Sequence, residues 1–113
     1  MTDCVQLSTT LPDKATATRL GAQLVEERLA ACAQVVGPVS SSYWWQGQVE
    51  QAQEWYCHLK TTYGASPKLS RRLRELHPYE VPEIIVVEIK EGDPSYLQWI
   101  RETVQSSPTL PVP

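Results

Sequence analysis

The chain has 113 residues, of which 42% are hydrophobic and 20% are charged, and its formal net charge is −3. This composition excludes an intrinsically disordered chain and predicts a single folded domain over residues 1–106, followed by a loose, proline-rich tail over residues 107–113. We expect no nucleic-acid partner, because phosphate binding usually leaves a basic footprint that this acidic chain lacks.

The first residues do not combine a basic stretch with an apolar one, so we expect no signal peptide. No apolar run approaches the length of a membrane span. The three cysteines, Cys4, Cys32 and Cys57, form no CxxC pair, which fits free thiols in a reducing compartment better than a disulfide framework. We therefore expect a cytoplasmic protein with no membrane partner.

The first two elements are a strand and a helix. Residues 4–10 are partly β-branched and predict a short strand. Pro12 and Asp13 suit a helix start, and apolar residues at helical spacing carry this helix to about residue 31. Gly21 lies in the apolar stripe, so the helix is expected to approach its neighbours closely.

A long β-ribbon follows over residues 34–62. Gln46-Gly47 supplies a tight turn, because glycine readily takes a positive φ, and this turn places Trp44 opposite Val49. Gly37-Pro38 cannot continue an ordinary central ladder, so we expect a bulge or bend there.

The second half of the chain contains two helices and one strand. Ser66-Pro67 is expected to open a helix, with Ser66 as its N-cap, and Pro78 ends it. Residues 77–83 form a rigid loop with two prolines. Residues 84–89 predict a buried strand, and Asp93-Pro94 caps a last helix.

The element order β-α-β-β-α-β-α predicts an α+β fold. Without its last helix it is the ferredoxin-like βαββαβ arrangement, in which two helices cover one face of a four-stranded antiparallel sheet. The present chain adds a long β-hairpin and an extra C-terminal helix. The opposite face of the sheet must be either exposed to solvent or covered by other protein groups.

The ribbon predicts a partner chain. Each arm has about twelve residues and spans about 40 Å, whereas a compact chain of this length has a diameter of roughly 34 Å. Tyr43, Trp44 and Trp45 lie at its tip and point to alternate faces, so they cannot all reach this chain's own helices. An exposed aromatic ribbon would aggregate unless it paired with copies of itself in a closed ring. The alternative is that the ribbon curls back over its own sheet.

Four segments of the sequence match a known family: residues 24–32 (LVEERLAAC), 43–47 (YWWQG), 60–62 (KTT) and 77–84 (HPYEVPEI). Through them the sequence resembles the CutA family of divalent-cation-tolerance proteins, from about Val5 to Trp99. This resemblance implies a ferredoxin-like subunit in a tight cytoplasmic homotrimer with ribbons exchanged between neighbours, an architectural likeness to the PII signalling proteins, and a link to tolerance of copper and other divalent metals.

The resemblance also suggests where a metal would bind. In some bacterial members copper binding is attributed to a cysteine late in the first strand and to two adjacent histidines before the loop proline. The corresponding positions here are Ser8 and Leu76-His77. His77 is thus the one candidate ligand left for a divalent cation such as copper, and a lone imidazole does not make a tight site. We expect no other cofactor.

A ligand-binding cleft is predicted around the proline-rich loop. Rigid loops often carry functional groups, and a histidine with nearby carboxylates could bind a cation, a small ligand or a proton. The resemblance places the end of the ribbon strand near an intersubunit cleft, where it could join the loop. In the structural interpretation, the histidine instead closes its helix and the glutamates bond across a subunit interface. The candidate residues are Lys60, Thr61, His77, Tyr79, Glu80 and Glu83.

Three functions stay open. The first is a trimeric regulatory or metal-response protein with a ligand between its subunits. The second is a small enzyme that uses His77 with Glu80 or Glu83 as acid and base, and the third is a purely structural assembly protein. We do not expect an enzyme, because no nucleophile or phosphate-binding motif is present. An RRM-type RNA-binding domain shares the element order, but its aromatic motif is absent.

Overall fold

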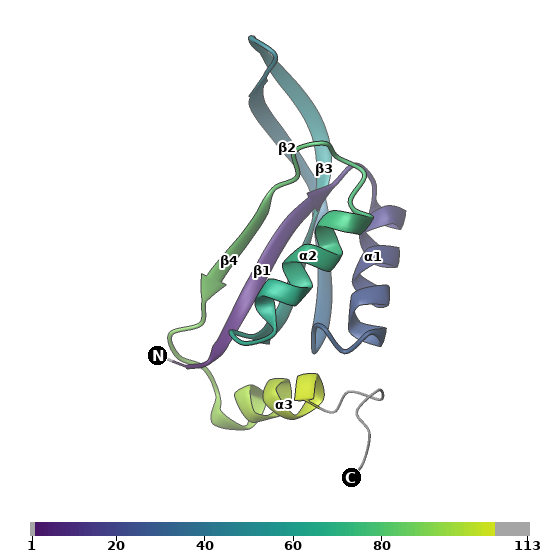
Figure 1. Cartoon of the computed structure of the whole chain (residues 1–113). Coiled ribbons are helices and arrows are strands. Elements are labelled where there is room, and N and C mark those ends of the chain that lie inside the picture. The colour runs from purple at the N-terminus through teal and green to yellow at the C-terminus, as the bar shows by residue number, and fades with distance from the viewer. Residues whose placement is uncertain (1, 106–113) are drawn as a thin grey trace.

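The computed structural model describes residues 2–105, which form one four-stranded sheet and three helices (Figure 1). The strand order is β2-β3-β1-β4 and all neighbours are antiparallel, which confirms the ferredoxin-like α+β prediction. Within residues 2–105 no helix is long and apolar enough to cross a membrane. The predicted tail at residues 107–113 lies outside the described residues. The elements are β1 (Cys4–Leu11), α1 (Lys14–Glu26), β2 (Cys32–Trp45), β3 (Gln48–Thr62), α2 (Ser66–Leu76), β4 (Ile84–Glu88) and α3 (Pro94–Gln105).

Helices α1 and α2 pack on one face of the sheet and enclose the main core. Helix α1 begins as predicted, because the Asp13 carboxylate accepts a hydrogen bond from the Thr16 N–H at 2.7 Å. Gly21 lies so close to β2 that an added methyl group would come within 2.8 Å of the Ala33 Cβ. The largest core side chains are Leu7, Leu11, Leu24, Leu59, Leu69 and Leu73.

Strands β2 and β3 form the predicted ribbon. Trp44 lies opposite Val49, and a register shift between residues 36 and 39 marks the expected bulge. Gln46 and Gly47 take φ angles of 51° and 82°, as a tight hairpin turn requires. The structure measures 54 × 30 × 22 Å, and its radius of gyration of 15.1 Å exceeds the ~13 Å of a compact chain of this length. The ribbon therefore overhangs its own domain and does not curl back over the sheet (Figure 1).

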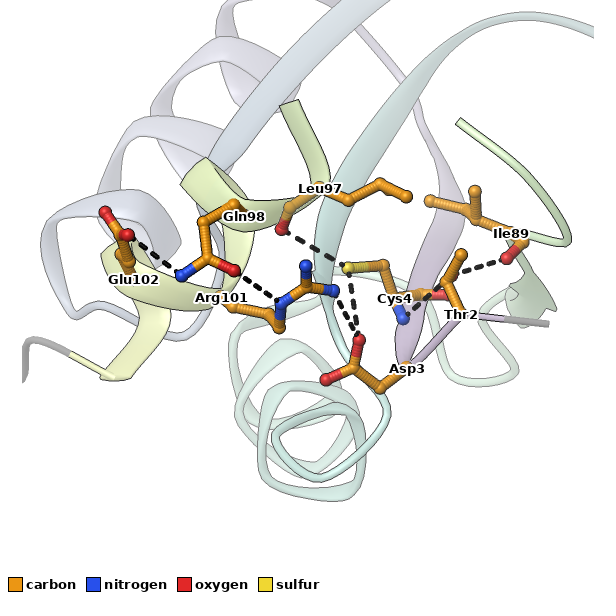
Figure 2. Close-up of polar contacts among 8 residues, drawn as sticks. All are labelled: Thr2, Asp3, Cys4, Ile89, Leu97, Gln98, Arg101 and Glu102. Carbon is orange, nitrogen blue, oxygen red and sulfur yellow. Dashed lines mark hydrogen bonds and ion pairs between the residues drawn. The ribbon is translucent and has the colours of Figure 1, made fainter. Parts of the chain in front are cut away.

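Helix α3 and the N-terminal residues form a second, smaller core at the end of the sheet (Figure 2). Arg101 Nη1 donates to Asp3 Oδ1 at 2.8 Å, and Thr2 Oγ1 donates to the Ile89 carbonyl at 2.6 Å. These polar contacts surround the apolar ones and fix α3 against the start of β1. The buried residues of this core are Cys4, Ala31, Leu97 and Ile100.

Two helix boundaries differ from the prediction. The helix predicted to reach residue 31 ends at Glu26, and Arg28 then takes a φ of 63°. The Leu29 N–H bonds the Leu24 carbonyl at 3.1 Å, which closes the helix so that the following residues enter the core. Ser66 is not the N-cap of α2 but its first residue, and the cap is Ala65.

Strand β4 was predicted to be buried, and this prediction is wrong. Among the described residues it is an edge strand that pairs only with β1, and three of its apolar side chains are exposed. Its apolar sequence is typical of a strand covered on both faces, but residues 2–105 of one chain provide no such cover. The exposed side chains are Ile85, Val86 and Val87.

Candidate functional site

The proline-rich loop, residues 77–83, crosses from α2 to β4 beside the base of the ribbon (Figure 1). Between loop and ribbon lies an open hollow of about 850 Å³. Three of the predicted site residues line it from the loop side: Tyr79, Glu80 and Glu83. The predicted interface residues line it from the ribbon side: Tyr43, Trp44 and Trp45. The structure thus brings the loop and ribbon predictions together in one place.

His77 lies beneath the hollow and not in its lining. Its Nδ1 accepts a hydrogen bond from the Tyr79 N–H at 3.1 Å, which assigns the proton of the neutral ring to Nε2. Nε2 lies 3.0 Å from the Thr10 carbonyl, to which it donates, and 2.9 Å from Thr9 Oγ1. Burial lowers the pKa of His77, although the Thr10 bond and the Glu54 charge oppose this. Nε2 therefore ties the loop to β1, and Nδ1 holds the loop to itself.

Tyr79 and Glu54 form a bonded polar pair in the wall of the hollow. The Tyr79 hydroxyl donates to Glu54 Oε2 at 2.7 Å, and only 7% of Glu54 is exposed. Burial raises the pKa of Tyr79, and the bond to the carboxylate raises it further. The phenol therefore stays neutral and holds a largely buried carboxylate at the base of the ribbon.

The hollow is acidic and aromatic. Three carboxylates line it, from Glu54, Glu80 and Glu83, and none of the described lining residues is basic. Tyr56 adds a further ring to those of the loop and the ribbon tip. Negative charge beside aromatic faces favours a cation over an anion.

The other two predicted cleft residues lie elsewhere. Lys60 Nζ donates to Gln34 Oε1 at 2.6 Å across the β2–β3 ladder. Thr61 is fully buried, and its hydroxyl donates to the Leu29 carbonyl at 2.8 Å. Within one chain neither residue lines the hollow.

The copper ligands suggested by the resemblance do not fit one chain. Ser8 bonds His58 on the opposite face of the sheet, and it is Thr9 that contacts His77. Leu76 carries no donor atom, and both nitrogens of His77 are bonded. Within residues 2–105 no three His, Cys, Asp or Glu side chains gather closely enough to hold a metal ion.

The cysteines are free thiols that the fold protects to different degrees. Cys4 is buried under α3, with its Sγ 3.8 Å from the Leu97 carbonyl (Figure 2). Burial raises the pKa of Cys57 to about 11. Cys32 is half-buried, with its Sγ 3.5 Å from the Tyr96 hydroxyl.

Sequence reasoning missed Glu54, Tyr56 and His58. They occupy alternate positions of β3, between residues that face the main core, such as Cys57 and Leu59. This alternation was visible in the sequence and places all three on the face opposite α1 and α2.

The fold and hollow define a ferredoxin-like subunit with a projecting ribbon and an acidic, aromatic recess at the ribbon base. A sequence profile described as CutA1 divalent ion tolerance protein matches residues 5–103. The chain therefore belongs to the CutA divalent-cation tolerance family, as the four segments predicted.

Individual relatives match over nearly their whole length. The divalent-cation tolerance protein CutA of Thermus thermophilus is 48% identical over 93 residues, which cover 82% of this chain and 90% of the relative. A crystal structure of CutA from Xylella fastidiosa has a TM-score of 0.88 at 38% identity and covers 91% of this chain and 99% of its own. The structure of an Archaeoglobus fulgidus CutA, described as periplasmic, has a TM-score of 0.86 at 32% identity and covers 89% and 98%.

Proposed function

We propose that this chain forms a cytoplasmic homotrimer that binds a cationic ligand in clefts between its subunits and acts in a regulatory, non-catalytic role. The observation that carries the proposal is the overhanging ribbon. One subunit leaves 75% of Trp44 exposed at the ribbon tip. Large exposed aromatic side chains on a strand pair invite association.

The two edges of the sheet favour a ring over a simple dimer. One edge is β2, which runs into the ribbon, and the other is β4, with its exposed apolar side chains. If the β2 edge of one copy meets the β4 edge of the next, the contact is head-to-tail, and such contacts form a ring when the rotation between successive copies closes. The resemblance to the CutA family implies that such a ring contains three copies.

Light scattering tests the assembly. We expect a particle of three times the 12.7 kDa subunit mass at micromolar concentration. Trp44→Ala and Trp45→Ala should loosen it, because both remove an anchor from the proposed interface. Trp99→Ala is the matched control, since it removes an exposed tryptophan from α3. A particle of subunit mass, or equal loosening by the control, contradicts the proposal.

The acidic hollow supports the ligand half of the proposal. It lies where a neighbour's ribbon would approach, so a second subunit could close it into a cleft. Titration calorimetry with copper(II) should show binding that weakens in the Glu80→Gln/Glu83→Gln variant and stays unchanged in Glu26→Gln, an exposed glutamate of α1. An assembled trimer that binds no cation would leave only a structural role.

An acid–base enzyme finds less support. A general base needs a free nitrogen or oxygen within reach of a substrate. His77 has both ring nitrogens bonded and does not line the hollow. Glu80 and Glu83 would then act without the imidazole, and we propose no catalytic role for them.

A further inference from the structure

The face of the sheet opposite α1 and α2 carries a polar cluster centred on His58. Side chains alternate along β3, so Leu59 enters the main core whereas His58 points the other way. In the ladder His58 lies directly between Ser8 of β1 and Gln34 of β2. Helix α3 packs against Cys4, at the end of this face.

The polar side chains of this cluster bond His58 through one ring nitrogen, Nδ1. Ser8 Oγ lies 2.8 Å from His58 Nδ1, and the Gln6 amide nitrogen lies 3.4 Å from the same atom. The Tyr56 ring stacks on the imidazole, with ring centroids 5.3 Å apart and planes inclined by 15°. Because these partners are already in place, the Nδ1 side of the imidazole stays bonded when the face is covered.

Apolar side chains continue the same face toward the edge of the sheet. Ile85 and Val87 of β4 lie directly opposite Ser8 and Gln6, and they are 50% and 54% exposed. A polar centre that is internally bonded and bordered by exposed apolar residues suits burial against protein. The overhanging ribbon of the same sheet already requires another copy of the chain, so a copy is the occupant that fits. This step rests on the proposed self-association.

We propose that another copy of the chain covers this face and that protonation of His58 loosens the assembly at mildly acidic pH. Neutral His58 needs no counter-ion in a closed interface. Imidazolium would bring a buried charge, and it would turn an N–H toward the donor nitrogen of Gln6. The groups around it are Gln6 and Ser8 from β1, Gln34 from β2, Tyr56 and Lys60 from β3, and Glu83 from the loop before β4.

The charges around His58 agree with this direction. Burial lowers the pKa of His58, Lys60 lowers it further, and only Glu83 opposes them. Covering the face adds burial, so separated subunits bind more protons than assembled ones. The assembly is then fully stable above the pKa of His58 in the separated subunit, which burial and Lys60 already hold below the ordinary value of about 6.5, and it weakens as the pH falls below that pKa. Each linked proton changes the dissociation constant by up to ~10-fold per pH unit.

Sedimentation at neutral pH and at mildly acidic pH, above and below the pKa of His58, tests the proposal, with circular dichroism to check that the subunit stays folded. We expect the wild type to dissociate on acidification and His58→Leu to stay assembled. His58→Leu retains His77, so it separates the two histidines. Lys60→Met should flatten the pH dependence in part, because it removes the neighbouring charge.

The outcomes separate this inference from the proposed function. An assembly that ignores pH, or a His58→Leu variant that dissociates like the wild type, overturns the role of His58 and leaves the trimer intact. Monomers at every pH overturn both.

Discussion

Removing the Tyr79 hydroxyl should destabilise the fold at the base of the ribbon. Tyr79→Phe deletes the donor that lies 2.7 Å from Glu54, a carboxylate that is 7% exposed. A hydrogen bond to a charged group contributes about 1.5–3 kcal/mol, and its loss leaves the carboxylate poorly solvated. We therefore expect a loss of about 2 kcal/mol in the free energy of unfolding. For a domain of this size that lowers Tm by roughly 10 °C.

Thermal unfolding at one fixed subunit concentration measures this loss, with Tyr63→Phe as the control because 66% of Tyr63 is exposed. In a Glu54→Gln background the cost of Tyr79→Phe should fall to about half, since a neutral acceptor makes a weaker bond. An unchanged Tm, or the same cost in Glu54→Ala, would refute the reasoning.

The same pair predicts a response to alkali. Burial and Glu54 raise the pKa of Tyr79 above its ordinary value of 10.0. A raised pKa in the folded state means that the stability from the neutral phenol is complete below pH 10 and is lost above it. Tyr79→Phe should therefore be less sensitive than the wild type to pH above that value.

Two further substitutions test local packing and backbone conformation. Gly21→Ala gains ~1 kcal/mol of helix propensity, but its methyl group would meet the Ala33 Cβ at 2.8 Å. We expect the overpacking cost of ~1–3 kcal/mol to exceed this gain. Thermal unfolding should therefore show a lower Tm for Gly21→Ala than for Gly64→Ala, which adds a methyl group in open space. Arg28→Gly and Arg28→Ala both lose the hydrogen bond from the Arg28 side chain to the Thr103 carbonyl, but only glycine adopts a φ of 63° without strain. In urea unfolding the glycine variant should therefore be more stable than the alanine variant by ~1 kcal/mol. Equal unfolding midpoints would contradict this.

The ribbon shows what a local signal can determine. Gln46-Gly47 fixes the turn, and once the turn is fixed the pairs follow from Trp45 opposite Gln48 to Val39 opposite Glu54, where the register shifts. The end of α1 carries no comparable signal. Arg28 takes a conformation that favours glycine because the next residues must turn into the core, and that requirement belongs to the tertiary structure.

The hollow was predictable only in part for a related reason. Tyr79, Glu80 and Glu83 stand close together in the sequence, and the prolines of their loop marked them as a rigid group. Glu54 reaches Tyr79 through the position of β3 in the sheet, which no local pattern specifies. The position of Lys60 is set by the same strand register, which places its side chain beside Gln34 and away from the hollow of its own chain.

The wrong prediction for β4 has a physical reason that also bears on assembly. An apolar run such as Ile84–Glu88 indicates that a strand is buried on both faces, but it does not indicate whether the burying residues belong to the same chain or to another. In one subunit the run lies on an unpaired edge with its side chains in water, a position that soluble proteins usually blunt with charge or proline. If the sequence is adapted to burial, the missing cover comes from outside the chain. The exposed edge of β4 and the exposed tip of the ribbon thus both indicate burial against another chain, and the ring of copies that we propose would cover both.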